Sequence, residues 1–212
     1  MPDSEYKDEI IHRLSEKYPK AKIALNFSNP MELLVATILS AQCTDIIVNK
    51  ITTQLFKKYT SVEDYASADI NQFEKEIKSA GFYHNKAKNI IASAKMIHKE
   101  YKGSVPSKME ELISLPGVAR KTANIVLYNA FGITDGIAVD THVGRLSQRL
   151  GLTRNNDPVK IEKDLMEIIP RPLWGSFPYL LIEHGRAVCI ARKPKCSICN
   201  LSDICPSALN QK

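Results

Sequence analysis

The sequence predicts an all-α protein with two helical domains, and three observations support this prediction. Helix start and stop signals recur along most of the 212 residues. Between them, apolar residues recur at helical spacing, as in the segment from Leu34 to Leu39. No run that alternates apolar and polar residues is long enough for a useful strand, because IAVDTHV (137–143) is too short to support a sheet. The chain is therefore expected to be helical throughout.

Cap residues mark the individual helices in order. Asn29-Pro30 precedes the first apolar stretch, with Glu32 placed to return a hydrogen bond to the cap. Further start signals are Thr44, Ser61, Asp69, a Ser107–Glu110 capping box and Asp157-Pro158. Expected stop signals are Gly81, Gly103 and Pro170. Composition changes near Asp135-Gly136. We therefore expect a central helical-bundle domain over 23–135, with a helical hairpin at about 108–131, and a terminal domain formed by 1–22 plus 136–212.

Composition restricts the functional class only loosely. Lys and Arg number 29 against 23 Asp and Glu, which gives a net charge of +6 and weakly favours a polyanionic partner. The first ten residues, MPDSEYKDEI, have no apolar core of the kind that a secretory signal needs, and they do not resemble a transit peptide. No apolar run approaches the roughly 20 residues that span a bilayer. We expect a cytoplasmic protein without a membrane partner.

Four of the five cysteines crowd into the C-terminal segment with the spacing Cys189-x6-Cys196-x2-Cys199-x5-Cys205. In an intracellular protein this clustering indicates a metal site more than disulfides. Structural zinc more often takes two close pairs of ligands, whereas an iron–sulfur cluster offers four separated corners that suit one close pair and two single ligands. The spacing favours a cluster and leaves zinc as the alternative. Cys43 stands apart and is interpreted as a buried, inert residue.

The hairpin at residues 112–123 reads LISLPGVARKTA, in which Pro116-Gly117 forces a tight turn between two helices. The start of the second helix leaves backbone N–H groups free for an anion such as a DNA phosphate. Arg120 and Lys121 lie in its first turn, where cations oppose the helix dipole. An anionic partner would explain them, and so would a neutral lysine favoured by the dipole, Arg120 and partial burial. A neutral amine is a nucleophile for imine chemistry; an ordinary solvated lysine is the alternative.

Asp140, in AVDTHV, directly precedes a helical stretch, so one role for it is a helix cap. Backbone N–H donors keep such a carboxylate ionised. An ionised carboxylate can also stabilise an oxocarbenium-like sugar as a base departs, by analogy with glycosidases. Both roles remain open at this point. His142 in the same motif is interpreted as structural.

Taken together, LPGVARKTAN, AVDTHV and the C-x6-C-x2-C-x5-C motif, in that order and spacing, closely resemble the endonuclease III family of DNA glycosylases. The resemblance covers essentially the whole chain. It implies a helix–hairpin–helix fold of two helical domains with a DNA groove between them, and a [4Fe–4S] cluster on Cys189, Cys196, Cys199 and Cys205. It further implies base flipping, attack of Lys121 on C1′ of the damaged nucleotide, assistance from Asp140, and strand nicking by β-elimination.

The same resemblance implies the partners and contacts. The substrate would be double-stranded DNA with oxidised or ring-saturated pyrimidines or abasic sites, bound by a monomer associated with the nucleoid. Gln42 resembles the residue that fills the gap left by the flipped nucleotide, and Phe82 stands where a leucine that wedges into the base stack is usual. The full set of expected DNA contacts is Gln42, Phe82, Leu115, Gly117, Ala119, Arg120 and Lys193. Lys193 is included for its charge and its place between Cys189 and Cys196, not from the resemblance, and a solvated surface residue is its alternative. Ala119 replaces a usual glycine, which we expect to weaken DNA contact somewhat and to leave the chemistry intact.

Two other functions fit parts of the sequence. A mismatch or alkylated-base glycosylase could use the same scaffold, although such relatives usually lack the lysine. A metal-stapled DNA-binding module without catalysis is the second alternative, and the paired presence of Lys121 and Asp140 argues against it.

Overall fold

The structure is a computed structural model that describes residues 4–209. The first three residues of the acidic N-terminal stretch, and the last three of the predicted terminal domain, lie outside the described residues. Within 4–209 all regular structure is helical and no strand forms, which confirms the all-α prediction. None of the helices in this part of the chain is long and apolar enough to cross a membrane. The chain divides into two compact units, unit 1 (Met1–Ile23 with Thr134–Lys212) and unit 2 (Ala24–Ile133).

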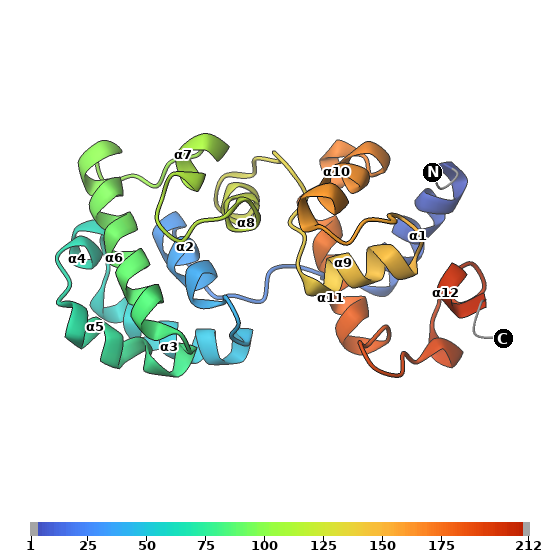
Figure 1. Cartoon of the computed structure of the whole chain (residues 1–212), viewed down its shortest axis with the longest axis horizontal. Helices are drawn as coiled ribbons and strands as arrows, with labels where there is room; N and C mark the ends of the chain where they lie inside the picture. Colours follow the sequence, from blue (N-terminus) through green and yellow to red (C-terminus); the bar gives the residue numbers. More distant parts are fainter. Residues whose placement is uncertain (1–3, 210–212) are drawn as a thin grey trace. The chain divides into compact units, whose positions relative to one another are not determined.

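Unit 2 is a bundle around helix α2 (Figure 1). Its elements are α2 (Pro30–Leu39), α3 (Asp45–Lys58), α4 (Val62–Ala66), α5 (Ile70–Ile77), the 3-10 turn η1 (Lys78–Ala80), α6 (Tyr83–Glu100), α7 (Met109–Ile113) and α8 (Arg120–Phe131). Every residue of α2 from Met31 to Leu39 is buried, and α2 packs against α3, α6 and α8. A helix that is apolar on all sides belongs inside a bundle. The loops at the end of α2 therefore start from the centre of unit 2.

Unit 1 is built from both ends of the chain. It contains α1 (Ser4–Lys17), α9 (Thr141–Arg149), α10 (Pro158–Ile168), η2 (Arg171–Leu173), α11 (Phe177–Ala187), η3 (Cys196–Ile198) and α12 (Pro206–Leu209). Helix α11 packs on α1 and α9, and α9 packs on α10. The shared core includes Ile10 of α1, Leu146 of α9 and Leu181 of α11, all fully buried. Burial of such side chains stabilises each by about 1.5–3 kcal/mol relative to exposure.

The cap signals were accurate at most helices. Asn29 accepts the Glu32 N–H at 2.9 Å, and Pro30 opens α2 as expected. The Glu32 carboxylate returns to the N–H of Ser28 rather than to that of Asn29. The capping box predicted at Ser107 is wrong, because α7 begins at Met109 with Lys108 at its N-cap. A lysine side chain has no acceptor for a helix N–H, so the side chain of Lys108 does not cap this helix.

Candidate functional site

Helix α6 packs against the turn of the hairpin between α7 and α8 and fixes its position. Gly117 has φ +78°, a conformation that side-chain-bearing residues rarely adopt. A Cβ at this position would lie 2.7 Å from Nδ2 of Asn89 on α6, so the backbone must approach this side chain closely. The buried hydroxyl of Ser93, also on α6, donates to the Pro116 carbonyl at 2.8 Å. The turn therefore needs glycine both for its conformation and for its contact with α6.

Helix α8 begins directly after this turn. Its N-cap, Ala119, is extended with φ −89°, so alanine replaces the usual glycine there without backbone strain. Among the described residues no side chain caps the start of α8, and the N-terminal N–H groups of a helix favour anions. Arg120 and Lys121 are both exposed in this first turn. The expected partial burial of Lys121 is therefore wrong.

Leu115 does not fit its predicted role as a DNA contact. Its side chain is 2% exposed and belongs to the core. Its N–H donates to the Leu112 carbonyl, and its own carbonyl accepts from the Val118 N–H, both at 3.1 Å. Because neither the side chain nor the backbone groups are available, Leu115 holds the hairpin together instead of presenting a group to DNA. Gly117, by contrast, is exposed at the tip of the turn.

Asp140 is the N-cap of α9 in unit 1. Its Oδ1 accepts the N–H groups of His142 and Val143, both at 2.8 Å. The capping role is thus confirmed, and it leaves the second carboxylate oxygen, Oδ2, for another partner. The residue is half-buried, and its orientation is fixed by the two bonds to the helix. His142 contacts Arg145 through Nδ1 at 3.2 Å and lies against Gly185 of α11, which agrees with a structural role.

Three of the residues predicted to contact DNA share an unusual backbone. Gln42, Phe82 and Lys193 have φ of 52°, 47° and 54°, and only one other non-glycine residue in 4–209 has a positive φ. Such conformations cost about 1–2 kcal/mol per residue and persist where the surroundings impose them. The side chains of all three are exposed, and Phe82 is 66% exposed. An exposed phenylalanine held in a strained loop indicates selection for contact rather than for packing.

The four C-terminal cysteines line one cavity of unit 1, together with Arg149, His184 and apolar residues of α9 and α11. Within residues 4–209 no three His, Cys, Asp or Glu side chains are grouped so that they could hold a single metal ion. Four thiols around a shared cavity instead fit a cuboidal cluster, in which each thiolate would bind one of four separated iron corners. Burial raises the pKa of the Cys199 and Cys205 thiols. Iron would supply the positive charge that stabilises them as thiolates.

An arginine and a histidine support this cysteine loop from α9 and α11. Arg149 donates to the carbonyls of Ile190 and Ala191, both at 2.8 Å, and to Sγ of Cys189 at 3.4 Å. His184 lies between Tyr18 (Oη to Nδ1, 3.0 Å) and Cys199 (Sγ to Nε2, 3.4 Å). Burial, with a smaller effect from Lys17, lowers the pKa of His184 to about 4, so the imidazole is neutral. Each ring nitrogen of His184 thus has one hydrogen-bond partner, Tyr18 at Nδ1 and Cys199 at Nε2.

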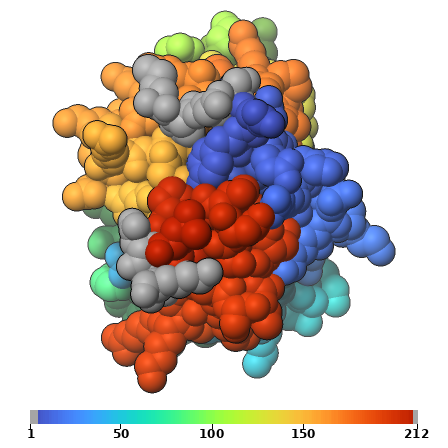
Figure 2. Space-filling view, turned by 90° about the vertical axis from the view of Figure 1, so that its right-hand side faces the viewer, coloured from blue at the N-terminus to red at the C-terminus, as the bar shows by residue number. Residues whose placement is uncertain are grey.

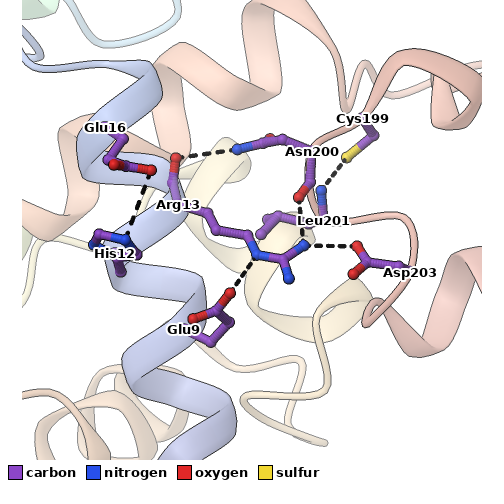
Figure 3. Close-up of polar contacts among 8 residues, drawn as sticks. All are labelled: Glu9, His12, Arg13, Glu16, Cys199, Asn200, Leu201 and Asp203. Carbon is purple, nitrogen blue, oxygen red and sulfur yellow. Dashed lines mark hydrogen bonds and ion pairs between the residues drawn. The ribbon is translucent and has the colours of Figure 1, made fainter.

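A third support comes from the N-terminal helix (Figure 3). Arg13 donates to the Asn200 carbonyl at 2.9 Å and to the Asp203 carboxylate at 2.7 Å, while Asn200 donates back to the Arg13 carbonyl at 3.0 Å. The Glu9 carboxylate accepts a hydrogen bond from Nε of the same guanidinium at 2.6 Å. In Figure 2 the C-terminal segment lies directly against α1 on the surface of unit 1. The cysteine loop is thus held by residues from three helices.

Sequence reasoning missed these supports. Arg13, Arg149 and His184 are separated from the cysteines by the fold, and nothing in the local pattern marks them as partners of the loop. Asn89 and Ser93 were missed for the same reason. The spacing of His184, five residues before the first cysteine on an apolar helix, was the one signal available.

Comparison with known proteins agrees with this geometry. Residues 35–171 match the model of the HhH-GPD superfamily base excision DNA repair proteins, and residues 189–205 match the iron–sulfur binding domain of endonuclease III. Endonuclease III of Synechocystis sp. is 56% identical over 200 residues, covering 94% of this chain and 91% of the relative. The Escherichia coli enzyme is 40% identical and 93% of each chain is covered.

A solved structure, a trapped covalent intermediate of endonuclease III with DNA, is 42% identical with a TM-score of 0.94. It matches 100% of this chain and 99% of its own. These similarities exclude a non-catalytic binding module and confirm the iron–sulfur cofactor as a [4Fe–4S] cluster. The chain therefore belongs to the endonuclease III family, the iron–sulfur DNA glycosylases of base-excision repair that also act as AP lyases.

Proposed function

We propose that Lys121 is the nucleophile and Asp140 the assisting carboxylate of this glycosylase and lyase. The observation that carries the proposal is the position of Lys121, exposed in the first turn of α8 beside N–H groups that no side chain within 4–209 caps. This start of a helix suits a DNA phosphate, and the lysine next to it can reach a bound nucleotide. A relative that is 42% identical has been solved as a covalent intermediate with DNA, and in this chain Lys121 is the residue assigned to that bond.

The chemistry proceeds through an imine. The base leaves with the electron pair of its glycosidic bond, and the carboxylate of Asp140 stabilises the positive charge on the sugar. The neutral amine of Lys121 bonds to C1′, and loss of the amine protons with opening of the sugar ring gives the imine. Loss of a proton from C2′ then expels the 3′ phosphate and nicks the strand. Oδ2 of Asp140 is the oxygen assigned to the sugar, because Oδ1 already accepts two helix N–H groups.

Cys189, Cys196, Cys199 and Cys205 are assigned as the cluster ligands. The cluster would supply, when bound, the core that this segment is too short to build from its own side chains. In this assignment the loop presents Lys193 to the DNA backbone. The other contacts are Gln42 and Phe82 at the lesion, with Gly117, Ala119 and Arg120 at the phosphates of the hairpin. Leu115 is not retained among them.

We further assign oxidised or ring-saturated pyrimidines and abasic sites in duplex DNA as the substrates, and the nucleoid as the site of action of a monomeric enzyme. Family membership and Lys121 support the lesion class. A panel of duplexes that carry one lesion each, with base release and strand nicking scored separately, tests it. Release of a mismatched or alkylated base, without release of an oxidised pyrimidine, would contradict the assignment.

Trapping with borohydride tests the roles of the two residues. Borohydride reduces an imine to a stable amine, so the wild-type chain should become covalently linked to abasic duplex DNA. Lys121→Ala should abolish the adduct, while Lys99→Ala, at an exposed lysine near the end of α6, should leave it intact. Asp140→Asn should retain trapping on abasic DNA better than release of a damaged base, because an abasic site has no base to expel. A full yield of adduct in Lys121→Ala would remove this residue from the mechanism.

A further inference from the structure

A buried ammonium group in unit 2 joins the ends of two helical segments. Lys86 lies in the first turn of α6 and is only 4% exposed. Its Nζ donates to the Leu39 carbonyl at 2.8 Å and to the Ala80 carbonyl at 2.7 Å. Lysine is almost never buried without partners of this kind. No role in the proposed chemistry accounts for a buried cation at this place.

The two carbonyls have the same structural origin. Leu39 is the last residue of α2, and Ala80 is the last residue of η1. The final carbonyls of a helix have no partner within it and carry partial negative charge, so a cation there is stabilising. The backbone N–H of Lys86 also donates to the Phe82 carbonyl at 3.2 Å. Lys86 is thus bonded to both ends of the segment 80–82 and, in addition, to the end of α2.

Each carbonyl stands just before one of the two left-handed residues proposed to act at the lesion. Gln42 follows Leu39 by three residues, and Phe82 follows Ala80 by two. Both keep positive φ values that cost free energy, so their loops must be held by their surroundings. Helix α2 is buried on all sides, and the ammonium ties the 80–82 segment to its end. One side chain therefore bonds directly to the backbone that precedes each of the two loops.

We propose that Lys86 is a positioning residue for lesion recognition, which sets the spacing between Gln42 and Phe82 so that both enter the duplex together. Lys86 itself is buried and touches no DNA. The inference rests on the proposed function of Gln42 and Phe82, since only their joint insertion needs a fixed spacing. A duplex requires it, because the gap that the flipped nucleotide leaves opposite its partner base must be filled while the stack is wedged open. A single strand has no opposite base and does not require it.

The test compares borohydride trapping of one abasic oligonucleotide as a duplex and as a single strand. Lys86→Met keeps the length of the side chain and removes its donors. We expect the trapping rate on duplex at low DNA concentration to fall by about tenfold or more, since small misplacements of positioning groups have effects of this order. Trapping of the single strand should stay within about twofold of wild type. Thr37→Val, which removes a buried hydrogen bond to the Leu33 carbonyl within α2, is the matched control and should change neither rate.

A double-mutant cycle separates positioning from general destabilisation. In a Gln42→Ala/Phe82→Ala background, Lys86→Met should lower the duplex rate by less than about twofold, because the groups that it positions are already absent. If Lys86→Met does not fold, as judged by its thermal unfolding and iron content, Lys86→Gln replaces it. The trapping rate should again fall on the duplex and stay nearly unchanged on the single strand. Equal losses on duplex and single strand, or additive losses in the cycle, would overturn the inference. Trapping that persists in Lys121→Ala would instead contradict the proposed function and leave the role of Lys86 separate.

Discussion

The hairpin of unit 2 and the cysteine loop of unit 1 are both assigned to DNA contact, but they are held in place by different physical means. The hairpin rests on buried helices: Leu115 lies in the core, and α6 supports the turn through Asn89 and Ser93. The loop has one fully buried apolar residue, Leu201, and Ile204 is partly buried against the core of unit 1. Side-chain bonds from Arg13, Arg145, Arg149 and His184 tie the rest of the loop. Apolar packing therefore fixes the hairpin, whereas the cysteine loop depends mainly on hydrogen bonds, an ion pair and its cofactor.

Because of this difference, an experiment that opens the cysteine loop should leave the hairpin folded. A packed segment resists change because its apolar contacts are lost only when the whole unit unfolds. A segment held by a cluster and by partly exposed ion pairs can open locally, because each exposed pair contributes little by itself. Loss of the cofactor should therefore affect one region and leave the other as it was.

The largest effect is expected from Cys199→Ala, which removes a proposed ligand together with its bonds to His184 and Leu201. Iron content should fall to a small fraction, and amide protection over 189–205 should fall by about 100-fold or more, because the metal replaces the missing core. Protection over 109–131 should be nearly unchanged. Hydrogen exchange with mass spectrometry measures both regions. Cys43→Ala, at the cysteine outside the loop, is the control and should retain the cluster; loss of protection in the hairpin as well would break the distinction.

An intermediate effect is expected from Gly117→Ala in the hairpin. Positive φ costs alanine about 1 kcal/mol, and overpacking against Asn89 adds about 1–3 kcal/mol. Gly132→Ala provides a matched comparison, because Gly132 also has positive φ (+69°) but has open space around its missing Cβ. Urea unfolding should show that Gly117→Ala loses more free energy of unfolding than Gly132→Ala, with iron content unchanged in both. Equal losses would mean that the contact with α6 is not tight.

The smallest effect is expected from Ala119→Gly, which restores the usual residue at the start of α8. Because φ of Ala119 is −89°, no backbone strain is relieved, and only easier approach of a phosphate to the backbone can improve binding. Affinity for duplex DNA should rise by no more than about fivefold, equivalent to about 1 kcal/mol, with trapping of abasic DNA unchanged. Fluorescence anisotropy with an undamaged duplex measures this; an unchanged affinity would show that the methyl group does not hinder the phosphate.

The sequence predicted the features that depend on local chemistry. Caps at Asn29, Thr44, Ser61 and Asp69 all formed because their side chains bond to N–H groups within three residues. Family motifs located Lys121, Asp140 and the cysteines. Burial was less predictable: Leu115 lies in the core and Lys121 is exposed, and both outcomes depend on which elements pack over the hairpin. For Lys86 a local signal existed, because it occupies the buried stripe of α6 with Ile90, Ala94 and Ile97. A lysine on such a stripe predicts a buried partner, although it does not identify the two carbonyls.

The way unit 1 is assembled from both ends of the chain has a consequence for biosynthesis. Helix α1 leaves the ribosome before unit 2, but the helix on which it packs, α11, and the groups that Arg13 binds, Asn200 and Asp203, are made after unit 2. Unit 2 is complete in sequence long before then and can fold while translation continues. Iron can therefore be captured only after unit 2 has been made, and α1 cannot pack in its final place until α11 has left the ribosome.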